Sequence, residues 1–136
     1  MAYSQDIADQ IVTRIAAGET LRAICREPGM PAWRTVYDWL DQNQEFATRF
    51  AHARDLGHDA IAEEAMAIAD EPVPSTAAGA TDAGAVAHAK LRVETRLKLL
   101  AKWSPKKYGE RQQIEHSGAV DVTSALSSAR RRSGLA

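Results

Sequence analysis

Two long stretches of helical periodicity, separated by a segment containing proline and glycine, constrain the fold of this chain most strongly. From about residue 45 to residue 70, apolar and small side chains recur at intervals of three and four, and a second stripe runs from about residue 85 to residue 103. This spacing predicts two amphipathic α-helices. The sequence between them, EPVPSTAAGATDAG (residues 71–84), contains two prolines and two glycines and predicts a loop or flexible connector. The pattern therefore predicts a long antiparallel helical hairpin.

The charge distribution supports pairing of the two long helices. Residues 44–71 carry a net charge of −5, whereas residues 72–103 carry a net charge of +3. Opposite charges on neighbouring helices attract one another, so the acidic helix and the basic helix can lie side by side. We expect the inner stripe of the second helix to consist of Val86, Ala89, Val93, Leu97 and Leu100.

The first 43 residues predict three short helices. Ser4 and Thr20 are placed to cap the first and second of them. Pro28 and Gly29 break the second helix, and Pro31 is placed to open the third. Three short helices with a break before the third are typical of a helix-turn-helix unit.

In such a unit the third helix lies in the major groove of DNA, with its apolar face against the scaffold. We expect that apolar face to comprise Trp33, Val36, Tyr37 and Leu40, and we assign Trp39 to packing. The expected DNA contacts come from the start of the third helix and from the second helix: Arg34, Thr35, Ala32, Arg22 and Arg26. A purely structural three-helix unit remains an alternative, because residues 1–43 have a net charge of −2, which opposes phosphate binding.

The role of the hairpin can be interpreted in two ways. It can pack only within its own chain, or it can join copies of the chain, because an isolated hairpin buries little core and its surplus apolar surface needs a partner. Leu99 and Trp103 lie off the inner stripe and favour an oligomer. The candidate interface residues are Phe46, Phe50, Ile61, Val93, Leu97, Leu99 and Trp103.

Motifs for catalysis or cofactor binding are missing from the sequence. The single cysteine, Cys25, cannot form an internal disulfide, and the four histidines do not form a metal-binding pair with one another at helical spacing. There is no phosphate-cradling glycine loop, no nucleophile elbow and no apolar run long enough to span a membrane. We therefore expect a protein that is not an enzyme, with no cofactor, no metal and no membrane partner.

Three stretches, residues 18–40, 46–70 and 91–118, resemble the small terminase subunit of tailed double-stranded DNA bacteriophages and prophages. The third, LRVETRLKLLAKWSPKKYGERQQIEHSG, is the most specific of them. The resemblance implies that the N-terminal unit recognises viral DNA at the packaging start site and that the hairpin assembles several copies into a ring. It also implies that the C-terminal part contacts the large terminase subunit, which holds the ATPase and nuclease, in the host bacterial cytoplasm. By this resemblance, Ile114, Glu115 and His116 form an extended segment that meets the large subunit.

The expected architecture is mainly α-helical and has three parts. Residues 1–43 form the helix-turn-helix DNA-binding domain, and residues 44–104 form the hairpin with its connector at 71–84. Residues 105–136 form an extended or β segment followed by a basic mobile tail. Two other functions stay open: a dimeric helix-turn-helix regulator of transcription or transposition, and a scaffold that binds no nucleic acid. Assembly size separates the regulator from the ring, because a regulator would be a dimer reading two half-sites.

Overall fold

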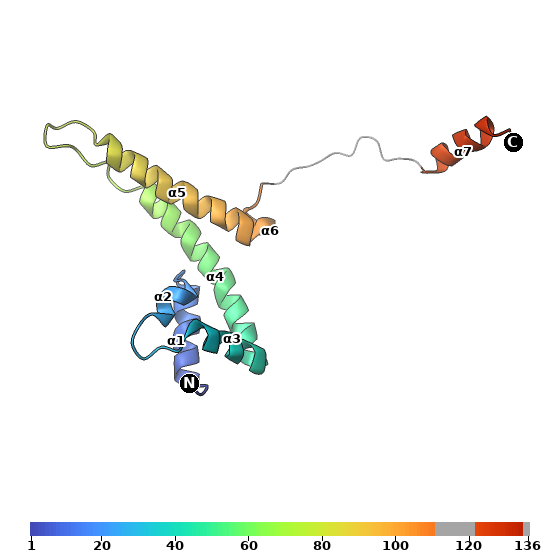
Figure 1. The fold of residues 1–136 in the computed structure, drawn as a ribbon. Coiled ribbons are helices and arrows are strands. Elements are labelled where there is room, and N and C mark those ends of the chain that lie inside the picture. The colour runs from blue at the N-terminus through green and yellow to red at the C-terminus, as the bar shows by residue number, and fades with distance from the viewer. Residues whose placement is uncertain (111–121, 135–136) are drawn as a thin grey trace.

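The computed structural model describes residues 1–110 and 122–134, and this part of the chain contains helices and no strands. The predicted, mainly helical architecture is confirmed (Figure 1). The helices are α1 (Gln5–Ala16), α2 (Leu21–Cys25), α3 (Trp33–Gln42), α4 (Gln44–Ala69), α5 (Ala83–Trp103), α6 (Pro105–Tyr108) and α7 (Val122–Arg132).

The short N-terminal helices begin largely where their capping residues predict. The Ser4 hydroxyl accepts a hydrogen bond from the backbone N–H of Ile7, and the Thr20 hydroxyl accepts one from that of Ala23. The prediction for Pro31 was wrong by two residues. This proline is buried before the helix, and α3 begins at Trp33.

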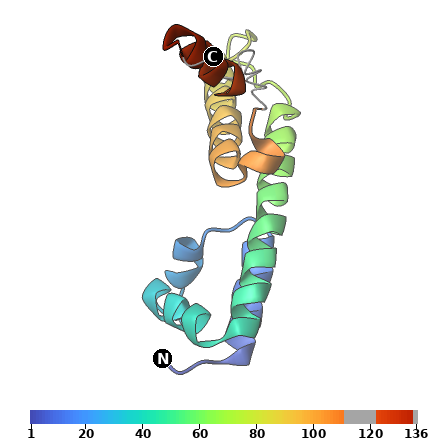
Figure 2. The same ribbon diagram turned by 90° about the vertical axis from the view of Figure 1, so that its right-hand side faces the viewer.

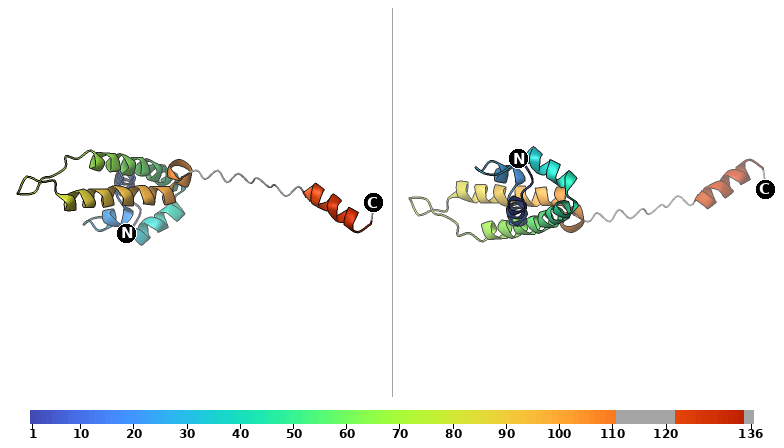
Figure 3. Two further views of the ribbon diagram at one scale, coloured as in Figure 1. Left: turned by 90° about the horizontal axis from the view of Figure 1, so that it is seen from above. Right: turned by 90° about the horizontal axis from the view of Figure 1, so that it is seen from below.

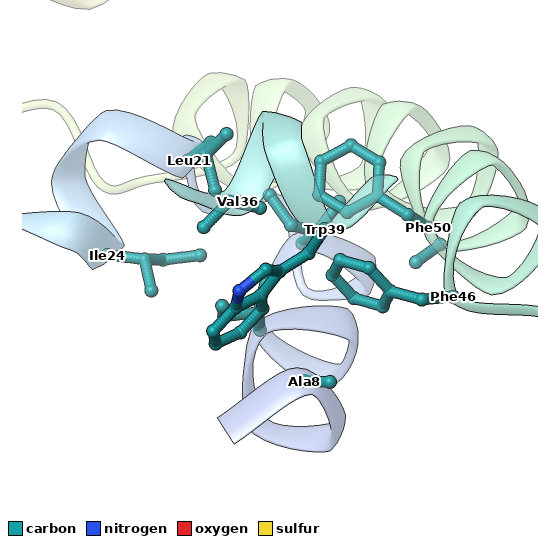
Figure 4. Packing of buried hydrophobic residues seen from close by; sticks show 10 residues of the cluster. Ala8, Leu21, Ile24, Val36, Trp39, Phe46 and Phe50 are labelled. Atoms are coloured by element: carbon teal, nitrogen blue, oxygen red, sulfur yellow. The ribbon is translucent and has the colours of Figure 1, made fainter. Parts of the chain in front are cut away.

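Helix α4 belongs to two packing units. Its first half completes the core formed by α1, α2 and α3, and its second half pairs with α5 (Figures 1 and 2). Trp39 is only 4% exposed and makes an edge-to-face contact with Phe46, which in turn contacts Phe50 (Figure 4). The packing role predicted for Trp39 is confirmed. The N-terminal core continues to Ala53, well past the expected boundary at residue 43.

The crossing of α1 and α4 depends on Gly57. A Cβ atom placed on Gly57 would lie 2.3 Å from the carbonyl oxygen of Ile15, so no other residue fits without displacing the backbone. This close approach lies near the end of α1, where Gly18 turns the chain with a positive φ of 93°. Gly57 thus fixes how the N-terminal unit sits on the long helix.

We predict that Gly57→Ala destabilises the protein. In an open helix this change would stabilise by about 0.5–1 kcal/mol, whereas overpacking costs about 1–3 kcal/mol. The melting temperature of the variant, followed by circular dichroism, should therefore fall by several degrees. Gly84→Ala is the matched control, because its Cβ would meet only a carboxylate oxygen of the half-buried Asp82 side chain, at 3.3 Å, and no backbone atom. Equal melting temperatures for the two variants would contradict the assigned role of Gly57.

The predicted pairing of acidic and basic helices is confirmed. Helices α4 and α5 lie side by side and antiparallel (Figures 1 and 3). Arg96 forms an ion pair with Glu64 at 3.2 Å, and Arg92 forms one with Glu71 at 3.4 Å. The connector between the helices is a loop closed by an isolated bridge between residues 75 and 81.

The predicted inner stripe of α5 was too wide. Leu100 is fully buried, whereas Leu97 is 50% exposed and Val86 is 43% exposed. The reason is that, among the described helices, α4 is the main neighbour of α5 over most of its length, and one neighbouring helix covers only a narrow seam.

The chain after α5 differs from the expected extended segment at two places. Residues 105–108 form the short helix α6, which is held on α4 because Lys107 and Tyr108 both donate hydrogen bonds to the Asp59 carboxylate. Helix α7 occupies residues 122–132, where a mobile tail was expected. The expected extended segment Ile114–His116 lies outside the described residues. None of the described helices is long and apolar enough to cross a membrane.

Candidate nucleic-acid interface

The five residues predicted to contact DNA lie on α2 and at the start of α3. Arg22 is an exposed residue of α2, and Arg26 is the exposed residue that ends it. Ala32 precedes the first turn of α3 and supplies no capping side chain. Arg34 in that turn is exposed, and Thr35 is half-buried. The start of a helix carries partial positive charge, which favours a phosphate at this end of α3.

Two of these arginines converge on one aromatic ring. The guanidinium carbon of Arg22 lies 4.1 Å from the centroid of Trp33, and that of Arg34 lies 5.1 Å from it. Both distances are within the range of cation–π attraction. Trp33 itself is half-buried against the N-terminal core and makes an edge-to-face contact with Tyr37. We call Arg22, Trp33 and Arg34 the arginine–tryptophan cluster.

The prediction that Tyr37 lies on the inner face of α3 was wrong, because its side chain is 46% exposed. Trp39 takes the inner position instead. Sequence reasoning also missed the link between Arg22 and Trp33. They belong to different helices, and the only local signal was an aromatic residue followed directly by Arg34 at a helix start.

Three of the six acidic residues of this unit are held by other arginines. Arg14 pairs with Glu19 and Glu27, with N···O distances of 2.6 Å in both cases. Its hydrogen bonds hold the pKa values of both carboxyl groups below their usual range. Arg49 pairs with Asp9 at 2.7 Å, and their hydrogen bond lowers the pKa of that carboxyl group.

The three arginines expected to contact DNA are left without such partners. Within residues 1–110 and 122–134, no salt bridge joins Arg22, Arg26 or Arg34 to a carboxylate. The net charge of −2 for residues 1–43 therefore overstates the repulsion that a phosphate would meet at this face. Asp38 and Asp41 remain exposed farther along α3.

We predict that Arg14→Gln lowers stability in a pH-dependent way. The carboxyl pKa values of Glu19 and Glu27 are depressed below their ordinary value of 4.5 in the folded state. Their contribution is therefore complete above that value and is lost as the pH falls through the lower folded pKa values. The gap in melting temperature between wild type and variant should be constant from neutral pH to about pH 5 and should shrink below that.

Lys90→Gln is the control for this experiment. Lys90 is 75% exposed and its pair with Glu94 is 3.7 Å long, so its removal should change the melting temperature little at any pH. A pH-independent gap for Arg14→Gln would show that the loss does not come from the two glutamates.

The residues expected at an oligomer interface fall into two groups. Phe46 and Phe50 are 1% and 5% exposed within the N-terminal core, which leaves them almost no surface for another chain. The second group is accessible. Leu97 and Trp103 are 50% exposed, and Leu99 is 37% exposed.

The remaining two candidates lie between these extremes. Val93 is half-buried on α5, and Ile61 is half-buried on α4. Ile61 lines a cavity between the end of α1, α4 and the end of α5, together with Trp103 and His58. The rings of His58 and Trp103 stack with their centroids 5.8 Å apart. Further exposed apolar side chains on the hairpin are Met66 and Leu91.

Comparison with known proteins identifies the family. The family model of the bacteriophage Sf6 terminase small subunit-like proteins matches residues 3–115. The chain belongs to this family. Resemblance to small terminase subunits is thereby confirmed, and with it a role in phage DNA packaging as the generally non-catalytic, regulatory subunit.

Solved structures agree with the family assignment. The chain is similar to the terminase small subunit gp1 of the bacterial virus Sf6, as seen in crystal structures of three variants with different single substitutions. In each case the identity is 38%, the TM-score is 0.67, and the similarity covers 88% of this chain and 86% of the other. A search of curated proteins found no match.

Proposed function

We propose that this protein is a DNA-packaging adaptor in the host bacterial cytoplasm. Its N-terminal unit binds viral DNA at the packaging start site, its hairpins assemble into a ring, and the assembly recruits and regulates the large terminase subunit. The observation that carries the DNA-binding part is the separation of charges in the N-terminal unit. Arg14 and Arg49 hold Glu19, Glu27 and Asp9, which leaves the arginines of α2 and α3 available.

The position of α3 supports contact with DNA. Val36 and Trp39 fix the helix on the scaffold, with 0% and 4% exposure, while Arg34 lies on the opposite, exposed side of its first turn. Within the part of the chain that the structure describes, each unit offers three arginines without a salt bridge at this face, so binding by a single copy would be weak and sensitive to salt. Several copies in one assembly would strengthen it through avidity.

We predict that Arg34→Ala weakens duplex binding without changing assembly. Loss of one phosphate contact reduces the magnitude of the salt slope, the slope of log affinity against log salt concentration, by about one. Loss of a bidentate guanine contact raises Kd by about five- to hundredfold. Fluorescence anisotropy with labelled duplex over a salt series measures both quantities. Lys98→Ala, a change of the same charge on exposed α5, is the control. If Lys98→Ala weakened binding as much as Arg34→Ala, the hairpin rather than α3 would carry the DNA site.

The exposed apolar residues of the hairpin support ring assembly. Leu97 and Leu99 lie on α5 outside the seam with α4, and Leu91 and Met66 add apolar surface on the same hairpin. Trp103 stacks on His58 of α4 and is still 50% exposed. Each is well exposed in the single chain, and exposed apolar surface of this kind is typical of protein interfaces. The proposed interface is therefore confined to residues of the hairpin that the N-terminal core does not use.

We predict that Leu97→Glu breaks the assembly into smaller species. A charge at a buried interface position loses its hydration, while in the isolated chain the same side chain reaches solvent. Light scattering coupled to size exclusion should show a discrete assembly well above a dimer for wild type and a smaller mass for the variant, with unchanged helicity. Val73→Glu in the connector is the control, because Val73 is 60% exposed but lies outside both helices. A wild-type dimer would instead favour the alternative function, a dimeric helix-turn-helix regulator.

The contact with the large subunit rests on the family resemblance. Its proposed residues, Ile114, Glu115 and His116, lie outside the described part of the chain. The anchoring of α6 supports a contact with the large subunit near this end of the hairpin. The hydrogen bonds of Lys107 and Tyr108 to Asp59 hold α6 on α4, a few residues before the proposed contact in the sequence.

A further inference from the structure

We propose that Trp33 is a positioning residue that holds Arg22 and Arg34 together as one paired donor for DNA. The inference rests on the proposed DNA-binding function and adds to it a residue that does not itself need to touch the nucleic acid. The chemistry to be recognised is a set of closely spaced hydrogen-bond acceptors, which a duplex offers as guanine O6 and N7 or as phosphate oxygens.

The geometry supports a shared platform. Arg22 comes from α2 and Arg34 from α3, yet their guanidinium carbons lie 4.1 Å and 5.1 Å from the same indole centroid. Without that ring, two exposed arginines in different helices would repel each other and sample many rotamers. Attraction to one aromatic ring offsets part of this repulsion and reduces the conformational freedom that each side chain loses on binding.

The ring is held by the fold. Trp33 is the first residue of α3, is half-buried against the core and makes an edge-to-face contact with Tyr37 at 5.8 Å between centroids. Its position is therefore fixed by the same packing that fixes α3. The platform is thus available before DNA arrives.

Stacking does not consume the groups that bind DNA. A guanidinium that lies against an aromatic ring uses its face, and its N–H donors stay available at the edge of the plane. No carboxylate in the described residues forms a salt bridge with either arginine. An incoming anion or base edge would therefore be the first strong acceptor that this pair meets. Lysine, which lacks the planar fork, would not substitute for arginine here.

The test compares Trp33→Leu with Trp33→Phe in the full-length protein. Both variants shorten the side chain, but only phenylalanine keeps an aromatic face. We expect Trp33→Leu to raise Kd for a short duplex about five- to thirtyfold, because two arginine side chains must then be ordered on binding, and Trp33→Phe to remain close to wild type. Circular dichroism and the mass of the assembly establish that both variants fold and assemble.

A double-mutant cycle separates positioning from a general structural effect. If Trp33 acts through the arginines, Trp33→Leu should cost much less affinity in an Arg22→Lys, Arg34→Lys background than in wild type. Equal losses in the two backgrounds, or equal affinities for Trp33→Leu and wild type, would overturn the inference. Absence of salt-dependent binding by wild type would instead overturn the proposed function itself.

Two duplexes distinguish the source of the acceptors. If Trp33→Leu weakens binding to a guanine-rich duplex more than to an A·T-only duplex, the pair recognises base edges. If it weakens both equally and lowers the salt slope, the pair binds phosphates. Either result supports the positioning role.

Discussion

The structure depends on one helix that serves two cores. Helix α4 has 26 residues, which is a length of about 39 Å at the α-helical rise, and it takes part in the N-terminal unit along its first half and in the hairpin along its second. Gly57 lies between these halves and brings α4 into backbone contact with α1. Because the helix runs through both units without a break, the orientation of α3 and the orientation of the hairpin are set by the same element.

The net charge of this protein says little about its electrostatics, because the charged side chains are paired locally. The formal net charge is −1, a value that by itself predicts no affinity for DNA. Glu19, Glu27 and Asp9 of the N-terminal unit are nevertheless paired with Arg14 and Arg49. In the hairpin, Glu64 of α4 is paired with Arg96, and Glu71, just after α4, is paired with Arg92. Pairs of this exposed kind contribute little to stability. Their more important effect is to decide which cations remain unpaired at the surface.

Local signals allowed much of the fold to be predicted from the sequence. The caps at Ser4 and Thr20 were predictable because a capping side chain bonds to a backbone N–H only three residues away. The pairing of α4 with α5 was predictable because the two helices follow one another in the chain and carry opposite charge. The start of α3 was misplaced because Pro31 packs into the core before the helix begins.

Features that depend on tertiary packing were not predictable in this way. Periodicity shows that Leu97 lies near an apolar face, but not that α4 is the main neighbour of α5 among the helices that the structure describes. Phe46 and Phe50 were assigned to an interface because they lie on the apolar stripe of the first hairpin helix, whereas the N-terminal core buries them. The arginine–tryptophan cluster is of the same kind, since α2 must fold back on α3 before Arg22 can reach Trp33.

The continuity of α4 has a consequence for binding by an assembly. A flexible linker between a DNA-binding unit and an oligomer interface lets each unit find its own contact, at the cost of a lower effective concentration. Here the N-terminal core and the hairpin share a helix, and the crossing at Gly57 fixes the attachment. If the hairpins form the proposed ring, the arginine faces of neighbouring copies are presented at a fixed spacing and angle. Avidity then depends on whether the path of the DNA matches that spacing, so the assembly can discriminate by DNA shape and deformability as well as by base contacts.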